Sequence, residues 1–253
     1  MNYGPFIKDG FLAWTLTNNG YKYLTWNMVL HWNKVVPGVA LLVACSDKAS
    51  YHFLTREGVR CVLLDVVTDY GTQIVPFGSR QFSRLNRIKL RLLKQFAENS
   101  EIHQCLYIDG DIIVYKDIVS DIKERLSEAS LVMQCDEKQQ ECSSQITRIQ
   151  CPNVCTGLIA WNHGIDTRLF TVNDEALWNT KPEDQVWVNS MIQNLQIPVT
   201  PLSRSLYPNG ARASLTKNTP ELSEKAICLH YNYRVGDSKK ADMKRYGDWV
   251  LPY

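Results

Sequence analysis

Apolar and polar stretches alternate along the first third of the chain in a pattern typical of alternating strands and helices. The apolar run Phe11–Thr17 predicts a first strand, and the runs Val39–Ala44 and Val59–Leu64 predict two more. Between the first two runs, apolar side chains recur at helical spacing from Tyr21 to about Val35, and Pro37-Gly38 ends that helix. Strands that alternate with helices over so short a distance indicate a parallel sheet with right-handed crossovers.

The rest of the chain continues this pattern. Helices are predicted at Gln81–Ala97, at Asp117–Ser127, near Thr167–Leu177 and from Glu183 after Pro182, and strands at Leu131–Cys135, Cys155–Asn162 and Ile227–Tyr231. The polar span Asp136–Gln150 is predicted to be a loop. Because the chain shows no internal repeat and no low-complexity linker, we expect a single α/β domain over residues 1–253.

Two carboxylates interrupt the apolar segment Tyr107–Val114. The segment predicts a buried strand with acid at its end, because apolar residues flank Asp109 and Asp111 on both sides. Like charges at close range repel and dry surroundings disfavour both, so the pair needs a turn in water, a shared proton or a divalent cation. Since ligands of open α/β sheets bind where strands end, we interpret Asp109-Gly110-Asp111 as a metal site for a diphosphate.

Other polar residues should gather at the same edge of the sheet, because the ends of parallel strands lie together. These residues are Thr17, Asn18, Asn19, Asp47 and Asp65. The predicted helix Gln81–Ala97 leads directly into the Asp-Gly-Asp segment, and most of its basic residues are typical of a solvated face. Arg84 and Lys89 are the two that we take as candidates for the site.

The second half of the chain supplies further candidates. The strand Cys155–Asn162 begins with small residues, which indicates that another group approaches its backbone closely. Glu183 and Asp184 open a helix, where acids are common as caps, so capping alone and a functional role both remain open. Gln185 and Asn189 share one face of that helix. The last predicted strand contains His230 and precedes Gly236, Lys239 and Lys240.

The composition sets limits on the classes of function. A chain of 253 residues with 45% hydrophobic and 21% charged residues suits one globular unit. The net charge of +2 and the lack of a long basic block argue against nucleic acid and anionic membranes as partners. No segment approaches the roughly 18 apolar residues of a membrane span, and the first residues lack a signal-like pattern. We therefore expect a cytoplasmic location.

Half of the eight cysteines lie in apolar runs and are expected in the core. The others cluster at Cys135, Cys142, Cys151 and Cys155. This cluster could hold zinc or two disulfides, although it contains no CxxC pair and its spacings are irregular. Disulfides would need an oxidising compartment, for which the sequence carries no address.

The motifs, in their order, resemble those of glycosyltransferases of the GT-A fold, in particular the nucleotide-diphospho-sugar transferase group with its glycogenin-like and plant pectin xylosyltransferase-like families. The matching segments are Thr15–Tyr21, Tyr107–Asp111, Thr156–Asn162, Asp184–Asn189, and His230 with Gly236–Lys239. The resemblance implies a mostly parallel Rossmann-like sheet with a smaller acceptor-side mixed sheet. It also implies a nucleotide-binding half over about residues 1–115 and an acceptor and catalytic half over about residues 116–253.

The resemblance also implies roles for single residues. Asp109, Asp111 and His230 are the expected ligands of Mn²⁺ or Mg²⁺, and Lys239 is the expected partner of the diphosphate. Lys240 is an alternative to Lys239, because this chain has more residues between His230 and Gly236 than the glycogenin-like pattern. The other implied donor-binding residues are Thr15, Thr17, Asn18 and Asn19 for base and ribose, Arg84 and Lys89 near sugar and diphosphate, and Gly110 and Gly236.

The resemblance implies a reaction in which a sugar moves from a nucleotide-diphospho-sugar, a UDP-sugar, to a glycan or glycoprotein acceptor. It places Asp184 and Gln185 at the reaction centre and favours retention of the anomeric configuration. An inverting enzyme would instead use Asp184 or Glu183 as the general base. A phosphatase of the haloacid dehalogenase type, a nucleotidyltransferase and a non-catalytic sugar-nucleotide binder are the alternative functions.

Overall fold

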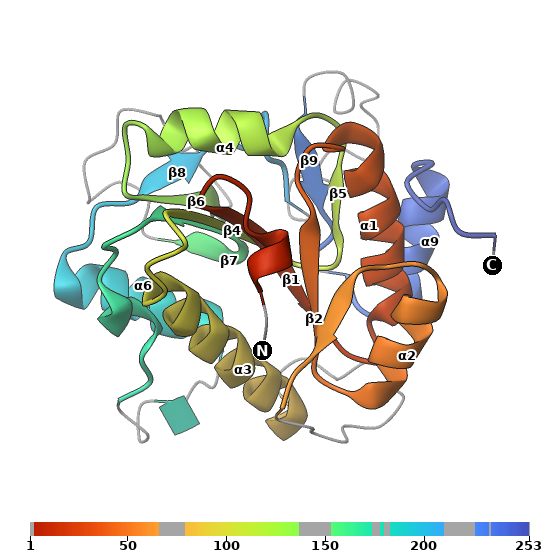
Figure 1. Ribbon diagram of the computed structural model, residues 1–253, viewed down its shortest axis with the longest axis horizontal. Coiled ribbons are helices and arrows are strands. Elements are labelled where there is room, and N and C mark those ends of the chain that lie inside the picture. Colours follow the sequence, from red (N-terminus) through yellow and green to blue (C-terminus); the bar gives the residue numbers. More distant parts are fainter. Residues whose placement is uncertain are drawn as a thin grey trace.

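Helices cover both faces of a central β-sheet in the computed structural model (Figure 1), which describes residues 3–65, 79–136, 153–173, 178–179, 183–209, 226–232 and 234–252. The described strands of this sheet run in the order β3-β2-β1-β4-β7-β6-β8. Their bounds are β1 Phe11–Thr17, β2 Leu41–Cys45, β3 Cys61–Leu63, β4 Gln104–Ile108, β6 Leu131–Cys135, β7 Val154–Asn162 and β8 Thr200–Leu202. Neighbours are parallel except at β7, which is antiparallel to both β4 and β6.

Successive side chains of a strand point to opposite faces of the sheet, so a separate apolar core forms on each face. In β1, Leu12 and Trp14 pack on the side of α3 (Arg80–Ala97) and α6 (Asp184–Leu195). Phe11 and Ala13 point to the other side, where α1 (Lys22–Val35), α2 (Lys48–Arg56) and α4 (Ile118–Leu126) pack. Because both faces are covered, the strands consist of continuous apolar runs, as expected for a parallel sheet.

The helices begin at residues that can cap them. Asp47 accepts a hydrogen bond from the Ser50 amide at the start of α2, and Asp117 accepts from the amides of Val119 and Ser120 at the start of α4. Short 3-10 turns lie at Gly4–Phe6 (η1) and Thr167–Phe170 (η2). The helix predicted near Thr167–Leu177 is therefore only this short turn within residues 167–173, and residues 174–177 lie outside the described part.

A second, two-stranded sheet lies beside the main one. It pairs β5 (Ile112–Val114) with β9 (Cys228–His230) in antiparallel register, so that Ile112 lies opposite His230. A small apolar cluster that includes Ile113, Leu229 and Met243 joins this sheet to α1 and to α9 (Asp237–Arg245). The predicted α/β fold with a mostly parallel main sheet and a smaller second sheet is confirmed, although the described small sheet is antiparallel rather than mixed.

The predicted single strand Tyr107–Val114 is wrong in one respect, because the structure divides it into β4 and β5. Asp109, Gly110 and Asp111 form a tight connection between them, which the Ile112 amide closes by donating to the Asp109 carbonyl at 3.1 Å. Gly110 packs against α1, where an added Cβ would lie 2.5 Å from Thr25 Oγ1. Since the apolar residues of both strands are buried, the apolar pattern could not reveal that they join different sheets.

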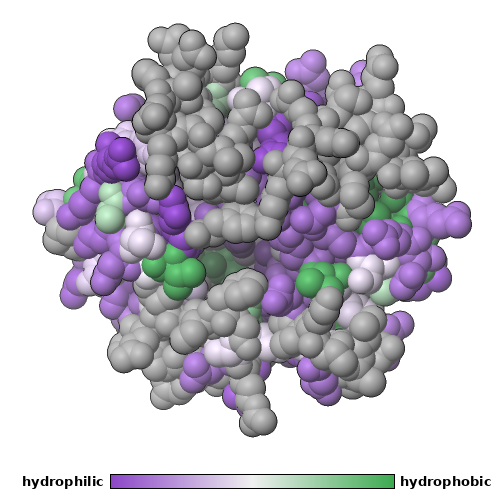
Figure 2. Space-filling model, turned by 180° about the vertical axis from the view of Figure 1, so that it is seen from behind, coloured by the Kyte–Doolittle hydropathy of each residue, from purple (hydrophilic) through white to green (hydrophobic). Residues whose placement is uncertain are grey.

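Surface and thiol features complete the fold. Among the described residues on the face shown in Figure 2, hydrophilic side chains prevail and hydrophobic ones form small separate patches. Within the described residues, no helix combines the length and apolar character that crossing a membrane requires. Cys135 is disulfide-bonded and Cys155 is a free thiol, whereas Cys142 and Cys151 lie outside the described residues.

Candidate active site

A cavity of about 880 Å³ lies where β1 and β4 end. One wall comes from α3 and another from the first turns of α6, and the floor comes from the Asp-Gly-Asp connection, β7 and β9. Of the residues predicted from sequence, it is lined by Thr17, Asn18, Lys89, Asp109, Gly110, Asp111, Glu183, Asp184, Gln185, His230, Gly236 and Lys239. The structure therefore brings together residues that lie more than 200 positions apart in the chain.

Asp109, Asp111 and His230 meet on the floor of this cavity. One ligand atom from each lies within 4.8 Å of the others, which is close enough for all three to hold one metal ion. His230 Nε2 lies 3.3 Å from Asp111 Oδ1 and 3.7 Å from Asp109 Oδ2. Two carboxylates and an imidazole suit a divalent ion such as Mg²⁺ or Mn²⁺. The residues present therefore fit a divalent cation.

Positive side chains surround the second aspartate. Lys239 Nζ donates a hydrogen bond to Asp111 Oδ2, and both side chains are buried. Burial alone would raise the pKa of Asp111, but the charges of Lys239 and His230 hold that pKa well below its usual range. Burial would lower the pKa of His230, yet Asp111 raises it well above its usual value. These neighbours thus keep the carboxylate of Asp111 in its ionised form.

Lys89 forms ion pairs with an aspartate of the Asp-Gly-Asp connection and with an aspartate at the start of α6. Its Nζ lies 2.8 Å from Asp184 Oδ2 and 3.4 Å from Asp109 Oδ1, and it lies over the ring of Tyr107 at 4.4 Å. Burial would lower the pKa of Lys89, but Asp109 and Asp184 raise it overall. The hydroxyl of Tyr107 donates a hydrogen bond to Asp109 Oδ1. Lys89 therefore stays charged and fixes the position of both carboxylates.

Hydrogen bonds to a carboxylate and to an amide fix the side chain of Gln185 in the first turn of α6. Its Nε2 donates to Asp136 Oδ2 at 2.8 Å and to Asn153 Oδ1 at 3.2 Å. One turn later, Asn189 exchanges hydrogen bonds with the backbone of Val154 at 2.8 and 2.9 Å, which ties α6 to β7. Because Nε2 is engaged, the carbonyl oxygen is the atom of the Gln185 amide that remains for a ligand.

Glu183 and Asp184 are not ordinary helix caps in the structure. Glu183 occupies the N-cap position but makes no side-chain capping bond. Asp184 Oδ2 has Lys89 as its ion-pair partner and accepts no further hydrogen bond within the described residues. A buried, ion-paired carboxylate at a cavity wall is not explained by capping alone.

Several predicted residues lie beside the cavity rather than in its lining. Thr15 is buried in β1, the Asn19 amide donates to Asp47 Oδ2 at 2.7 Å, and Arg84 is exposed on α3. Lys240 points away and lies over the ring of Trp249 at 4.9 Å. Lys239, rather than Lys240, is therefore the lysine of this pair that lines the cavity.

Other lining residues were missed from the sequence. Asp136 and Asn153 bind Gln185, and Cys155 Sγ lies 3.7 Å from His230 Nδ1. Asp136 follows directly on a strand, so the rule that ligands bind at strand ends could have found it. Nothing in the local sequence signals Asn153.

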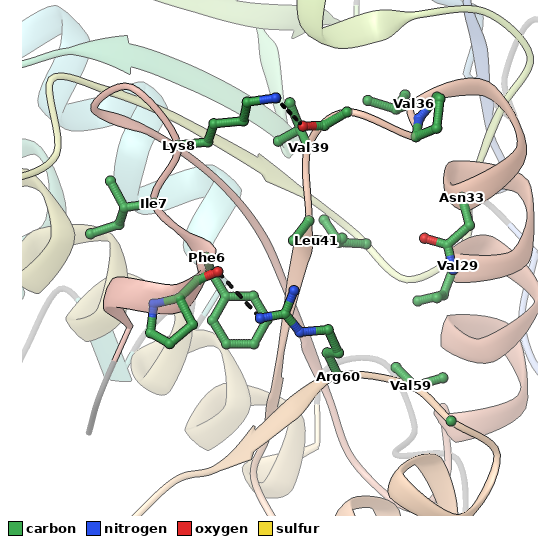
Figure 3. A pocket seen from close by; sticks show the side chains of 15 residues that line it. Phe6, Ile7, Lys8, Val29, Asn33, Val36, Val39, Leu41, Val59 and Arg60 are labelled. Carbon is green, nitrogen blue, oxygen red and sulfur yellow. Dashed lines mark hydrogen bonds between the residues drawn. The ribbon is translucent and has the colours of Figure 1, made fainter.

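A second hollow, of about 540 Å³, lies at the opposite edge of the sheet, near the start of β2 (Figure 3). Two cations border it and are already engaged with backbone carbonyls: Lys8 donates to Gly38 at 2.8 Å and Arg60 to Pro5 at 3.3 Å. The walls consist mainly of aliphatic residues and Phe6. The described residues that line this hollow include no acid and no histidine, and we place the functional site in the larger cavity.

The comparisons with known proteins agree with this geometry. Residues 39–243 match the family model described as nucleotide-diphospho-sugar transferase, and the chain belongs to this family. No curated protein sequence matched the chain. The fold is that of the GT-A glycosyltransferases, and the match favours a transferase over the phosphatase and nucleotidyltransferase alternatives.

Solved structures are similar in fold at low sequence identity. The galactosyltransferase LgtC in complex with donor and acceptor sugar analogues matches with a TM-score of 0.57 and 14% identity, over 95% of this chain and 97% of that one. Mouse xyloside xylosyltransferase 1 matches with a TM-score of 0.56 and 11% identity, over 88% and 99%. The glycosyltransferase GlyE of Streptococcus pneumoniae TIGR4 matches with 0.57 and 13%, over 94% and 60%.

The small residues at the start of β7 lead to a first prediction. A Cβ at Gly157 would lie 2.1 Å from His230 Cε1 and 2.9 Å from Asp109 Oδ2, so the predicted close approach is confirmed. We expect Gly157→Ala to lower the free energy of unfolding by about 1–3 kcal/mol, as is typical of overpacking. His230→Ala should recover most of that loss in the double variant, measured by urea unfolding in a double-mutant cycle. Additive effects of the two changes would contradict the contact.

Proposed function

We propose that this protein transfers a sugar from a UDP-sugar to a glycan or glycoprotein acceptor with retention of the anomeric configuration. Mn²⁺, or Mg²⁺ in its place, would be held by Asp109, Asp111 and His230 and would neutralise the leaving diphosphate. The observation that carries the proposal is the meeting of these three residues with Lys239, Asp184 and Gln185 in one cavity.

The charge of the cavity supports a cation-dependent donor site. The described residues that line it include five carboxylates and three lysine or arginine side chains, so the carboxylates outnumber these cations by two before His230 is counted. A nucleoside diphosphate is itself anionic, so it would be repelled from this surface without a divalent cation. A site for a neutral sugar alone would need neither the cation nor the buried lysine.

The residues around the cation have separate tasks in this proposal. Lys239, now against Asp111, lies where its ammonium can turn to the departing diphosphate. Thr17 and Asn18 line the cavity at the end of β1, where we place the uridine. The side chain of Thr17 is fixed by the Thr25 hydroxyl, which donates to Thr17 Oγ1 at 2.8 Å. In the same loop, Asp47 accepts a hydrogen bond from the backbone amide of Asn19.

The contacts of Asp184 support retention over inversion. A general base must accept a proton from the acceptor hydroxyl, and a carboxylate that is paired with a buried lysine at 2.8 Å is a poor base. Gln185 presents its carbonyl oxygen, which can stabilise a developing oxocarbenium ion but cannot act as a base. Glu183 remains the candidate base for an inverting reaction, because it lines the cavity without a capping bond.

Removal of one metal ligand tests the donor site. We expect Asp111→Asn to abolish the Mn²⁺-dependent part of UDP binding, measured by calorimetry with and without the metal. The loss of affinity should exceed the roughly 10–100-fold that is typical when a partner of a metal ligand is removed. Asp65→Asn is the matched control, because Asp65 is exposed and follows β3 at the same edge of the sheet. Unchanged UDP affinity in the Asp111 variant would refute Asp111 as a ligand of the metal. Tighter binding of GDP than of UDP would refute uridine as the nucleoside of the donor.

Lys239 and Lys240 form a natural pair for a second test. If Lys239 stabilises the leaving diphosphate, its charge matters more in the transition state than in the ground state. We expect Lys239→Ala to lower kcat by about 10²–10³-fold with a smaller change in donor affinity, whereas Lys240→Ala should retain near-normal turnover. The reverse order of the two variants in steady-state kinetics would move the role to Lys240.

The anomeric configuration of the product tests retention. NMR of the purified product should show the same configuration as the donor sugar. Gln185→Ala should lower turnover clearly, because it removes the carbonyl oxygen near the reaction centre. Gln193→Ala, on the same helix and also lining the cavity, should lower it much less. A product with the opposite anomer would rule out retention and leave Glu183 or Asp184 as the base.

A further inference from the structure

Gln134 is a buried polar residue in the centre of the molecule to which neither the sequence motifs nor the proposed reaction gives a task. It lies in β6, and its side chain is fully shielded from solvent. At this residue the pairing of β6 with β7 becomes irregular: Met133 lies opposite Ile159, but Gln134 lies opposite Cys155. Irregular pairing of this kind redirects side chains, and here it places the amide of Gln134 beside the ring of His230.

The hydrogen bonds of Gln134 fix the orientation of its amide. Nε2 lies 2.9 Å from the Tyr207 carbonyl and 3.2 Å from the Pro208 carbonyl, and carbonyl oxygens can only accept. The reversed orientation would bring the amide oxygen against these two oxygens. The amide nitrogen therefore faces the two carbonyls, and Oε1 faces His230.

This orientation in turn determines where the ring of His230 carries a proton. Gln134 Oε1 lies 2.9 Å from His230 Nδ1, and an amide oxygen can only accept, so Nδ1 must carry the hydrogen. The other neighbour of Nδ1 is the thiol of Cys155, which is more distant, at 3.7 Å, and is a weak acceptor. The opposite nitrogen, Nε2, faces Asp109 and Asp111.

We propose that Gln134 is the positioning residue of the metal-binding histidine: by accepting the Nδ1 hydrogen it directs the lone pair of Nε2 to the cation. This inference rests on the proposed metal site. Histidines that bind metals generally donate their other ring N–H to an acceptor, which sets the tautomer and the ring orientation. Gln134 is not among the described residues that line the cavity. It acts through His230 alone.

The test uses Mn²⁺ alone as the probe, followed by electron paramagnetic resonance of the full chain without donor. Gln134→Leu should weaken Mn²⁺ binding by about 10–100-fold, the usual cost of losing the acceptor behind a metal-binding histidine. Gln104→Leu is the matched control, because Gln104 donates to Asn162 at 3.0 Å away from the cavity and should leave Mn²⁺ affinity unchanged.

A second readout does not depend on any Gln134 variant folding. In the unmodified chain with ¹⁵N-labelled histidine and Mg²⁺, the ¹⁵N spectrum should show His230 protonated at Nδ1 and unprotonated at Nε2, assigned by its loss in His230→Ala. The opposite tautomer would overturn the proposal, as would normal Mn²⁺ affinity in a folded Gln134→Leu variant. Normal Mn²⁺ binding by both Asp111→Asn and Gln134→Leu would mean that the proposed metal site is wrong. Normal Mn²⁺ binding by Gln134→Leu together with weakened binding by Asp111→Asn would mean that only the positioning role of Gln134 is wrong.

Discussion

The need to hold two aspartates close together in a mostly buried position determines how this site is built. Asp109 and Asp111 lie in the same short connection, and each has its own positive partner: Lys89 at 3.4 Å from Asp109, and Lys239 against Asp111. Removing Lys239 would take away the lysine partner of the buried Asp111 carboxylate, which costs more than losing an exposed ion pair. The charges of the site therefore stabilise each other, and this arrangement also prepares the connection for a divalent cation and an anionic donor.

The fold brings these charges together by dividing one apolar run between two sheets. β4 fixes Asp109 to the main sheet, and β5 pairs with β9, which places His230 directly beside the connection. Lys239 comes from α9, which packs against the small sheet through Met243. Lys89 comes from α3, whose apolar face is held by the main core. Each charged group is thus carried by an element that is fixed by apolar packing, so the geometry does not depend on the ion pairs alone.

The sequence could predict the parts of this arrangement that have a local signal. Apolar runs located β1 and β6 to the residue, because a buried strand has a composition of its own. The Asp-Gly-Asp motif, the late histidine and the Asp-Gln pair were visible as motifs, and the structure places them in one cavity. Asp184 and Lys89 were candidates separately, but their ion pair depends on how α3 packs against α6, which no residue spacing encodes.

The features that could not be predicted from the sequence depend on tertiary contacts. The change of sheet after Ile108 was hidden, because the residues before and after it are equally buried. Gln134 had the appearance of an ordinary polar residue in a strand, and its contact with His230 arises from irregular pairing between strands. Arg84 was chosen for its position in a basic helix. It lies about one and a half turns before Lys89 on α3, so the two side chains point in different directions: Lys89 lines the cavity, whereas Arg84 is exposed.

A crystal structure of the protein with UDP and Mn²⁺, with anomalous scattering recorded for manganese, would show directly where the cation and the donor bind. We expect one manganese peak bounded by Asp109, Asp111 and His230, with Lys239 turned to the diphosphate and the uridine beside Thr17 and Asn18. Manganese bound elsewhere, or UDP bound outside this cavity, would contradict it.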